Sequence, residues 1–321
     1  MQSLISRRAV LGAVLGAAVP LARAQTYPNK PIHLLVGYVG GGMDVSARLL
    51  ASRLAALLGQ PVVVDNRPGA SSMIAVDLAS KAAPDGYTIL LADNGALIAN
   101  QLMKSAGDPF KRLAPLAGAF IQPLSIVVGN QLNARTPQEL IALLKANPTR
   151  YNFATSGVST VNHLAFRAML AQMNIPALTH ITYKGAAQII PDVVSGEVSI
   201  GVMSAVASLP IVRGGRMRAV ALMNTEKLSG AEDIPPLADA VPGFNVSSKQ
   251  FVMAPAGTPA PILQRLSEAL VTVLSSADIA QVAAQQGNIP WPIGPVELTA
   301  DMGRETMRWA KVIKDNNIVI E

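Results

Sequence analysis

Residues 32–59, IHLLVGYVGGGMDVSARLLASRLAALLG, decide the fold of this chain. The segment begins with a mainly apolar run, typical of a buried strand, and continues through three consecutive glycines, Gly40 to Gly42. From Asp44 onward, apolar residues recur at helical spacing until Gly59, a residue type that commonly ends helices. A strand, a loop and a helix in this order form the repeating unit of parallel α/β sheets, and we therefore predict an α/β fold.

The same order recurs along the chain. Short apolar runs predict buried strands at 32–38, 60–66, 87–93, 124–129, 151–156, 178–183 and 217–223. Helical spacing of apolar residues predicts helices within 44–59, 136–148, 160–174 and 186–196. This alternation is typical of mostly parallel sheets with helices on both faces, in which ligands bind at the carboxyl ends of the strands.

The length of 321 residues allows two domains with separate cores. No internal repeat and no low-complexity linker divides the sequence. Strands that cross between the domains must therefore connect them, and the runs 124–129 and 249–257 are the candidates.

The first 24 residues are typical of a signal peptide. Arg7 and Arg8 precede an apolar run, and Ala22-Arg23-Ala24 is a small-residue cleavage pattern. The paired arginines fit a twin-arginine signal, and they also occur in general secretory signals, so the export route stays open. We expect a periplasmic protein that is cleaved near Ala24.

The composition excludes several classes of protein. Without cysteine there is no disulfide, no thiol nucleophile and no zinc-thiolate motif. Removal of the signal peptide takes away three arginines and no acidic residue, which lowers the net charge from +6 to +3. With no basic tract and only 4% aromatic residues, the chain is not expected to bind nucleic acid. The three histidines lack metal-ligand spacing, and no metal or cofactor is expected.

The glycine loop has the features of an anion site. It follows a strand and opens a helix that Asp44 can cap, so free backbone N–H groups and the positive end of a helix dipole meet there. A dinucleotide fingerprint would need glycine in place of Val45, and a phosphate-binding P-loop would need lysine in place of Met43. Nucleotides are therefore not expected, and a simple tight turn is the alternative.

Two further loops repeat this arrangement. In DNRPGASSMIAVDLAS (65–80), a strand is followed by Ala70, Ser71 and Ser72, and in ATSGVSTVNHLAF (154–166) four hydroxyl residues precede a helix. Three such loops at one edge of a parallel α/β protein predict a pocket of neutral hydrogen-bond donors.

A periplasmic serine hydrolase is the alternative from another class. A nucleophile elbow requires G-x-S-x-G, whereas Ala154 and Val158 flank Ser156. We interpret His163 as a structural residue whose ring holds the loop by a hydrogen bond, rather than as a base, and we expect no catalytic residue. The alternative would use Ser156 or Ser159 with His163.

These motifs resemble a known family when they are taken together. The matching stretches include YPNKPIHLLVGYVGGGMDVSARLLASRL (27–54), LGQPVVVDNRPGASSMIA (58–75), SGVSTVNHLAF (156–166), HITYKGAAQIIPDVVSGEV (180–198) and APAGTPAPIL (254–263). In order and spacing, from Tyr27 to Ile313, they resemble the Bug-type extracytoplasmic solute receptors of tripartite tricarboxylate transporters.

The resemblance implies a two-lobed, type II periplasmic-binding-protein fold that closes around a small carboxylate. Residues 25–126 and 250–321 would form lobe 1 and residues 127–249 lobe 2, with the two crossover strands as the hinge. The implied ligand-binding residues are Tyr38, Gly41, Gly42, Asp44, Ala70, Ser71, Ser72, Asn94, Thr155, Ser156, Ser159, Thr160, His163, Tyr183, Lys184, Gly185 and Ser204. The implied partners are a carboxylate and the transmembrane permease subunits, with the receptor itself a monomer; a ligand sensor of the same fold is a further alternative.

The sequence departs from the family pattern in and beside this pocket. Gly37 and Gly40 stand where the family usually has proline, while Ser71, Ser72 and Ser159 stand where it usually has glycine. These changes suggest a ligand different from that of the commonest members. The family tryptophan before APAGTP is also absent, and Lys249 in that region is expected on the surface, with contact to an acidic ligand as the alternative.

Overall fold

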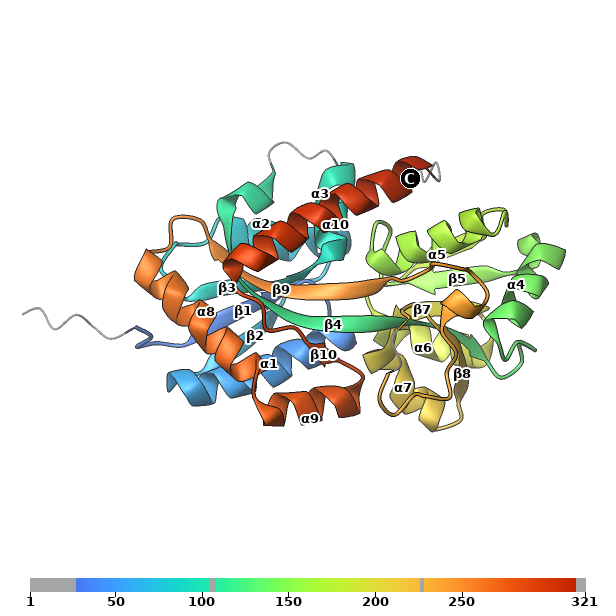
Figure 1. Cartoon of the computed structure of the whole chain (residues 1–321), viewed down its shortest axis with the longest axis horizontal. Coiled ribbons are helices and arrows are strands. Elements are labelled where there is room, and N and C mark those ends of the chain that lie inside the picture. Colours follow the sequence, from blue (N-terminus) through green and yellow to red (C-terminus); the bar gives the residue numbers. More distant parts are fainter. Residues whose placement is uncertain (1–26, 104–107, 226–227, 316–321) are drawn as a thin grey trace, which may run out of the picture.

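Two lobes lie side by side in the computed structural model, which describes residues 27–103, 108–225 and 228–315 (Figure 1). Two long strands, β4 (Leu113–Gly129) and β9 (Ser247–Pro255), run between the lobes. The predicted boundaries at 126/127 and 249/250 fall within these strands and stay predictions. The predicted signal peptide, residues 1–24, lies outside the described residues.

The sheet of the first lobe contains three parallel strands and the two crossing strands. β1 (Ile32–Val36) lies between β2 (Val62–Asn66) and β3 (Thr88–Asp93), and both pairings are parallel. β9 then pairs antiparallel with β3, β4 pairs antiparallel with β9, and the short β10 (Ile289–Pro290) pairs with β4. Leu34, in the middle of β1, is fully buried opposite Val64 and Ile89.

The sheet of the second lobe repeats this plan. β5 (Asn152–Thr155) lies between β6 (Thr179–Thr182) and β7 (Ile200–Ser204) in parallel, and β7 pairs antiparallel with the second half of β4. β8 (Met217–Leu222) pairs with the other edge of β4. The predicted α/β class is therefore confirmed, and the sheets are mixed because the crossing strands run antiparallel to their neighbours.

Ten α-helices cover the sheets in the described part of the chain. They are α1 (Gly42–Leu58), α2 (Met73–Ser80), α3 (Asn94–Met103), α4 (Pro137–Ala146), α5 (Val161–Gln172), α6 (Ala186–Ser195), α7 (Ala205–Arg213), α8 (Ala260–Leu274), α9 (Ala277–Gln286) and α10 (Pro295–Asp315). Among the described residues, no single helix is both long and apolar enough to cross a membrane, although the bent pair of α8 and α9 meets the length and composition test when taken together.

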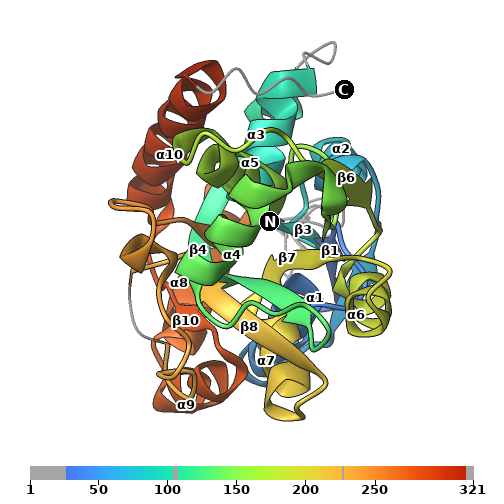
Figure 2. The ribbon, with the colours of Figure 1, turned by 90° about the vertical axis from the view of Figure 1, so that its right-hand side faces the viewer.

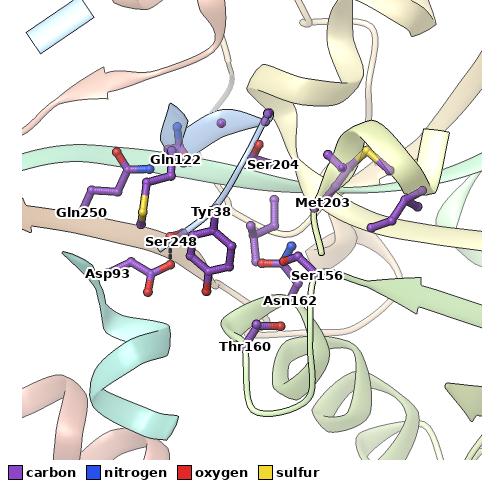
Figure 3. A pocket seen from close by; sticks show the side chains of 18 residues that line it. Tyr38, Asp93, Gln122, Ser156, Thr160, Asn162, Met203, Ser204, Ser248 and Gln250 are labelled. Carbon is purple, nitrogen blue, oxygen red and sulfur yellow. Dashed lines mark hydrogen bonds between the residues drawn. The ribbon is translucent and has the colours of Figure 1, made fainter. Parts of the chain in front are cut away.

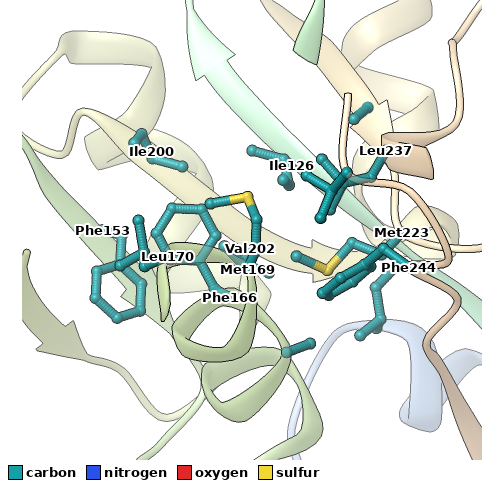
Figure 4. Close-up of a cluster of buried hydrophobic side chains, with 14 of the residues drawn as sticks. Ile126, Phe153, Phe166, Met169, Leu170, Ile200, Val202, Met223, Leu237 and Phe244 are labelled. Carbon is teal, nitrogen blue, oxygen red and sulfur yellow. The ribbon is translucent and has the colours of Figure 1, made fainter. Parts of the chain in front are cut away.

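Each lobe has its own apolar core. In the second lobe, Phe153, Phe166 and Ile200 lie in one cluster between the sheet and α5 (Figure 4). Truncating a fully buried phenylalanine such as Phe153 to alanine costs roughly 3–5 kcal/mol, so this cluster contributes strongly to the stability of the second lobe.

Helix α10 contacts both lobes. Leu298, near its start, belongs to a core cluster of the first lobe, whereas Trp309 is buried in the core cluster of the second lobe. Figure 2, which looks onto the second lobe, shows α10 along the edge of the molecule beside α3 and α5. The lobes are therefore joined by two strands and bridged by one helix.

Candidate ligand-binding cleft between the lobes

Four helices begin at one cavity between the lobes. The first residues of α1 come from the first lobe, and those of α5, α6 and α7 come from the second. Each of these helices follows one of the parallel strands β1, β5, β6 and β7, so all four N-termini lie at the carboxyl ends of these strands. Helix N-termini carry partial positive charge and unsatisfied N–H groups, so this convergence is suited to an anion.

Three of the four N-termini leave their N–H groups open to a ligand. The N-cap residues Gly41 of α1, Gly185 of α6 and Ser204 of α7 make no side-chain capping bond, whereas Thr160 caps α5 by accepting a bond from the His163 N–H. Gly40 and Gly41 have φ of 56° and 134°, values that favour glycine. The predicted anion site at the glycine loop therefore has an open array of backbone donors.

The cleft has an inner and an outer compartment. The inner compartment, about 60 Å³ in volume, is lined by Tyr38, Gly40, Gly41, Gly42, Met43, Asp93, Gln122, Leu124, Ser156, Thr160, Asn162, Gly185, Ala186, Ile189, Met203, Ser204, Ser248 and Gln250 (Figure 3). The outer compartment, about 590 Å³, is lined by Gly37, Tyr38, Pro68, Gly69, Ala70, Ser71, Ser72, Ser156, Gly157, Val158, Thr182, Tyr183, Lys184 and Gln188. Tyr38 and Ser156 line both compartments.

The lobes touch one another around the cleft, so the structure is a closed form. The Ser71 hydroxyl of the first lobe donates a hydrogen bond to the carbonyl of Val158 in the second. A Cβ added to Gly185 would lie 2.6 Å from the carbonyl oxygen of Val39, which shows how closely the two backbones approach. A Cβ on Gly42 would lie 2.3 Å from the Ser204 hydroxyl oxygen of the other lobe.

The serine loop of the first lobe has an unusual backbone. Ala70, Ser71 and Ser72 have φ of 46°, 51° and 75°, so three successive residues with side chains adopt the left-handed region. Such conformations cost about 1–3 kcal/mol each and persist where the surroundings require them. The hydroxyl of Ser72 is also buried without a hydrogen-bond partner.

Asp93 is the charged side chain of the inner compartment. It is 8% exposed, and burial raises its pKa to about 6 although the N–H of Ala96 and the hydroxyl of Ser248 donate to it. The opposing phenol, Tyr38, has a pKa raised well above its ordinary value by burial and by the charge of Asp93. None of the residues that line the inner compartment is a lysine, an arginine or a histidine.

Two buried glutamines from the crossing strands complete the inner wall. Gln122 of β4 donates to the Ser46 hydroxyl at 2.9 Å and to Asn288 Oδ1 at 2.7 Å. Gln250 of β9 is fully buried, and both its amide nitrogen and its amide oxygen lack a hydrogen-bond partner within the protein. A buried amide with neither atom paired is costly unless a ligand or water completes it.

A family model described as the tripartite tricarboxylate transporter family receptor matches residues 46–318 of the chain. The chain belongs to this family. Among the receptor's relatives, a UPF0065 protein of Bordetella bronchiseptica is 34% identical over 318 residues, which covers 98% of this chain and 94% of the relative. BugT of Bordetella pertussis is 33% identical over 315 residues, which covers 96% of each chain.

Solved structures share the two-lobed fold of the receptor. A protein of R. palustris, solved with adipate, superposes with a TM-score of 0.87 at 27% identity, covering 91% of this chain and 99% of that one. MatC of Rhodopseudomonas palustris, solved with bound malate, superposes with a TM-score of 0.83 at 26% identity, covering 89% and 100%. The predicted type II periplasmic-binding-protein fold is confirmed by these likenesses.

Most of the predicted site residues meet at the cleft of the receptor. Those that line the inner compartment are Tyr38, Gly41, Gly42, Ser156, Thr160, Gly185 and Ser204. Those that line the outer compartment are Ala70, Ser71, Ser72, Tyr183 and Lys184, again with Tyr38 and Ser156. Whether each of them contacts the ligand stays a prediction.

Five predicted residues line neither compartment. Asp44 pairs with Arg48 at 3.0 Å and accepts a bond from Asn66, while Asn94 donates to Glu305 Oε2 at 3.0 Å and accepts from the N–H of Lys249. The other three are Thr155 at the end of β5, Ser159 in the loop that follows it, and His163 in the first turn of α5.

His163 packs in a column of rings. Its ring stacks on His180 with the ring centroids 4.3 Å apart, and His180 stacks on Phe153 at 4.6 Å. Burial lowers the pKa of His163 to about 3 and that of His180 to about 4, so both rings are neutral at pH 7. No hydrogen bond joins a ring nitrogen of His163 to Ser156 or Ser159, and the Nδ1 atom has no partner. The structure shows ring stacking at His163 and no hydrogen bond from Nδ1 to the loop, which differs from the predicted hydrogen bond.

Lys249 corrects an expectation from the sequence. Its ammonium is 2.9 Å from Asp301 and 3.1 Å from Glu305, both on α10, and its side chain is only 24% exposed. It therefore lies neither on the open surface nor in the cleft. These ion pairs tie β9 to α10.

Four polar residues of the inner wall, from β3, β4 and β9, are not among those predicted from the sequence. They are Asp93, Gln122, Ser248 and Gln250. A partial signal was present, because Gln122 interrupts a long apolar run and the residues at the start of β9 that share a face, Ser248 and Gln250, are both polar. Polar residues at inward-facing strand positions indicate either a satisfied core network or a ligand site.

Proposed function

We propose that this protein is an extracytoplasmic receptor that captures a small carboxylate between its lobes and delivers it to the membrane permease of a tripartite transporter. The observation that carries the proposal is the array of uncapped helix N-termini, α1 from one lobe and α6 and α7 from the other, around a cavity with no basic side chain. Backbone amides from both lobes recognise a carboxylate only when the lobes are closed.

The volume of the inner compartment supports a small ligand. At about 60 Å³ it exceeds the roughly 10–15 Å³ that one water molecule requires and suits a ligand of a few heavy atoms. The adipate and malate in the solved neighbours support the same ligand class. The signal peptide expected from residues 1–24 and the neighbour BugD, a periplasmic binding protein, support a periplasmic location.

Under this proposal the receptor is a monomer, and it binds its ligand without converting it chemically. Tight binding of an acid without consumption of matching esters is expected, and an ester hydrolysis that disappears in His163→Ala would instead favour the hydrolase alternative. The position of His163 in its ring stack, with no bond to a serine hydroxyl, supports the receptor.

Thermal unfolding of the purified protein tests the proposal. A panel of small carboxylic acids is compared with their amides, each at millimolar concentration. A ligand at 100 times its Kd adds about 2.7 kcal/mol, which raises the Tm of a chain of this size by several degrees. A rise with an acid and none with its amide supports the proposal. A panel of mono-, di-, tri- and aminocarboxylates that leaves Tm unchanged throughout contradicts it.

A further inference from the structure

The two ends of the inner compartment differ in hydrogen-bonding character. The helix N-termini supply backbone donors, whereas the wall formed by the ends of β3 and β9 supplies the Asp93 carboxylate, the unpaired amide of Gln250 and the hydroxyl of Ser248 (Figure 3). In Figure 3, Asp93, Ser248 and Gln250 lie together on the side of the cavity away from Ser156 and Asn162, with Tyr38 between the two groups. A ligand that fits both ends must carry an acceptor at one end and a donor at the other.

Asp93 does more than a helix cap requires. Its Oδ1 accepts from the N–H of Ala96 at 3.0 Å and so caps α3, a task that serine or asparagine performs equally well without a charge. Its Oδ2 accepts a long bond of 3.4 Å from the Ser248 hydroxyl. An almost fully buried carboxylate with no cationic partner is costly, and a cationic ligand group that donates to Oδ2 would offset this cost.

The charge balance of the cavity points the same way. A bound carboxylate would bring a second negative charge into a compartment whose lining has Asp93 as its charged group and no basic side chain. Two like charges in an enclosed, poorly solvated space repel strongly. A cationic group on the ligand offsets this repulsion, because it pairs with Asp93 in the same cavity.

We propose that the ligand is a small aminocarboxylate, whose carboxylate faces the N-termini of α1, α6 and α7 and whose ammonium group faces Asp93 and Gln250. This inference rests on the proposed function and narrows it to one ligand class. The volume of about 60 Å³ favours a short chain between the two groups.

The pH dependence of binding follows from the groups that surround Asp93. Among the described residues, Tyr38 is the titratable side chain that faces Asp93. Lys249, Asp301 and Glu305 belong to the neighbouring network around Asn94, and their charged atoms make no hydrogen bond to Asp93. An ammonium pairs with ionised Asp93, so lowering the pH through its pKa of about 6 weakens binding. A ligand with carboxylates alone prefers protonated Asp93, and its affinity rises over the same range.

Calorimetric titration of the purified protein with matched pairs of acids tests the inference. The pairs are alanine and propionate, aspartate and succinate, glutamate and glutarate, and 4-aminobutyrate and butyrate. In at least one pair, the amino acid is expected to bind at least about tenfold more tightly at pH 7.5. Its affinity is expected to fall about fourfold at pH 5.5, while that of any partner acid that binds rises.

Three variants complete the test. Asp93→Asn and Asp93→Ser keep a capping side chain for α3 and remove the charge, and both are expected to abolish the preference for the amino acid. Asp108→Asn is the matched control, because Asp108 caps a short helical turn outside the cleft by accepting from Phe110 N–H. Unchanged selectivity in both Asp93 variants, each shown to be folded by its thermal transition, overturns the inference.

The outcomes separate this inference from the proposed function. If the acids without an amino group bind as tightly as the matching amino acids, or more tightly, the aminocarboxylate inference is overturned and the proposed carboxylate receptor stands. No binding by any member of the pairs, together with no response in the wider acid panel, contradicts the proposed function itself.

Discussion

The two lobes bury opposite kinds of titratable group beside the cleft. The first lobe holds Asp93, an acid whose pKa is raised, and the second holds His163 and His180, bases whose pKa values are lowered. In both lobes the charged form is disfavoured by burial. The acid costs stability when the pH is high and the histidines cost stability when it is low, so the lobes should respond to pH in opposite directions.

The backbones of the two lobes differ in a similar way. Next to the cleft, Ala70, Ser71 and Ser72 of the first lobe adopt the left-handed region. Among the described loop residues 156–160 of the second lobe, Ser159 is the one residue with a side chain that adopts it. The second lobe also caps α5 with Thr160. The comparison indicates that strain is concentrated on the side of the cleft formed by the first lobe.

The largest expected effect comes from separating the two lobes. In Gly185→Ala, the new methyl group would meet the carbonyl oxygens of Val39 and Gly40 at 2.6 and 3.2 Å, and it would do so only in the closed form. We expect affinity for the ligand to fall at least about a hundredfold, equivalent to about 2.7 kcal/mol, with little change in the Tm of the free protein.

The control for this variant is Gly303→Ala, since Gly303 lies within α10 with no atom near its added methyl group. It should leave affinity unchanged. Wild-type affinity in Gly185→Ala would show that the lobes do not close as tightly around ligand as in this structure.

Removing the buried charge of the first lobe should stabilise the free protein. The folded pKa of Asp93, about 6, lies above the ordinary 3.8, so the folded state holds more protons than the unfolded state between these values and stability falls as pH rises through them. Asp93→Asn should therefore raise the free energy of unfolding at pH 7 by up to about 3 kcal/mol and have little effect near pH 4. Chemical denaturation at both pH values measures this; a loss of stability at pH 7 would contradict it.

The second lobe should show the opposite sign. The folded pKa of His163, about 3, lies below 6.5, so the unfolded state binds more protons between these values and stability is lost as pH falls below 6.5. His163→Phe keeps a ring in the stack on His180 and removes the titration. The difference in the free energy of unfolding between the variant and the wild type should be about 2 kcal/mol more favourable to the variant at pH 5 than at pH 7.5. Parallel stability curves for the two proteins would show that His163 is not buried as described.

The smallest effect concerns the strained loop. Ser72→Gly removes a buried hydroxyl without a partner and relieves a φ of 75°, so it should stabilise the free protein by about 1 kcal/mol, a rise in Tm of roughly 2 °C. Differential scanning calorimetry detects this change. The control is Ser229→Gly, at an exposed site away from the cleft, which should give no gain. Destabilisation in Ser72→Gly would mean that its hydroxyl is satisfied by water.

The fold could be predicted because its units are local. In the segment 32–59, the strand, the glycine turn and the helix each have a signal within a few residues, and the structure places β1 at Ile32–Val36 and α1 at Gly42–Leu58. Strand β7 was not predicted, because Gly201 interrupts a short apolar run and its pairing with β4 comes from residues about 75 positions earlier. The first half of β4 was missed for a similar reason, since Pro115 and Gly118 weaken its local strand signal.

The site could be predicted only in part. Residues of the glycine and serine loops carry local signals, namely glycines and hydroxyl residues placed directly after strands. Asp93 and Gln250 acquire their roles from the pairing of β3 with β9, in which Asp93 lies opposite Gln250. Their burial beside a cavity depends on this long-range contact, so polar residues on one face of β9 cannot by themselves distinguish a ligand site from a satisfied core network.

The bridging position of α10 has a consequence for the energetics of capture. Because the helix is anchored through Leu298 in one core and through Trp309 in the other, it restrains the relative orientations that β4 and β9 alone would permit. A smaller ensemble of open arrangements means less rotational freedom to lose on closure. More of the contact energy between ligand and lobes then remains as affinity, so even a molecule of a few heavy atoms can be held firmly.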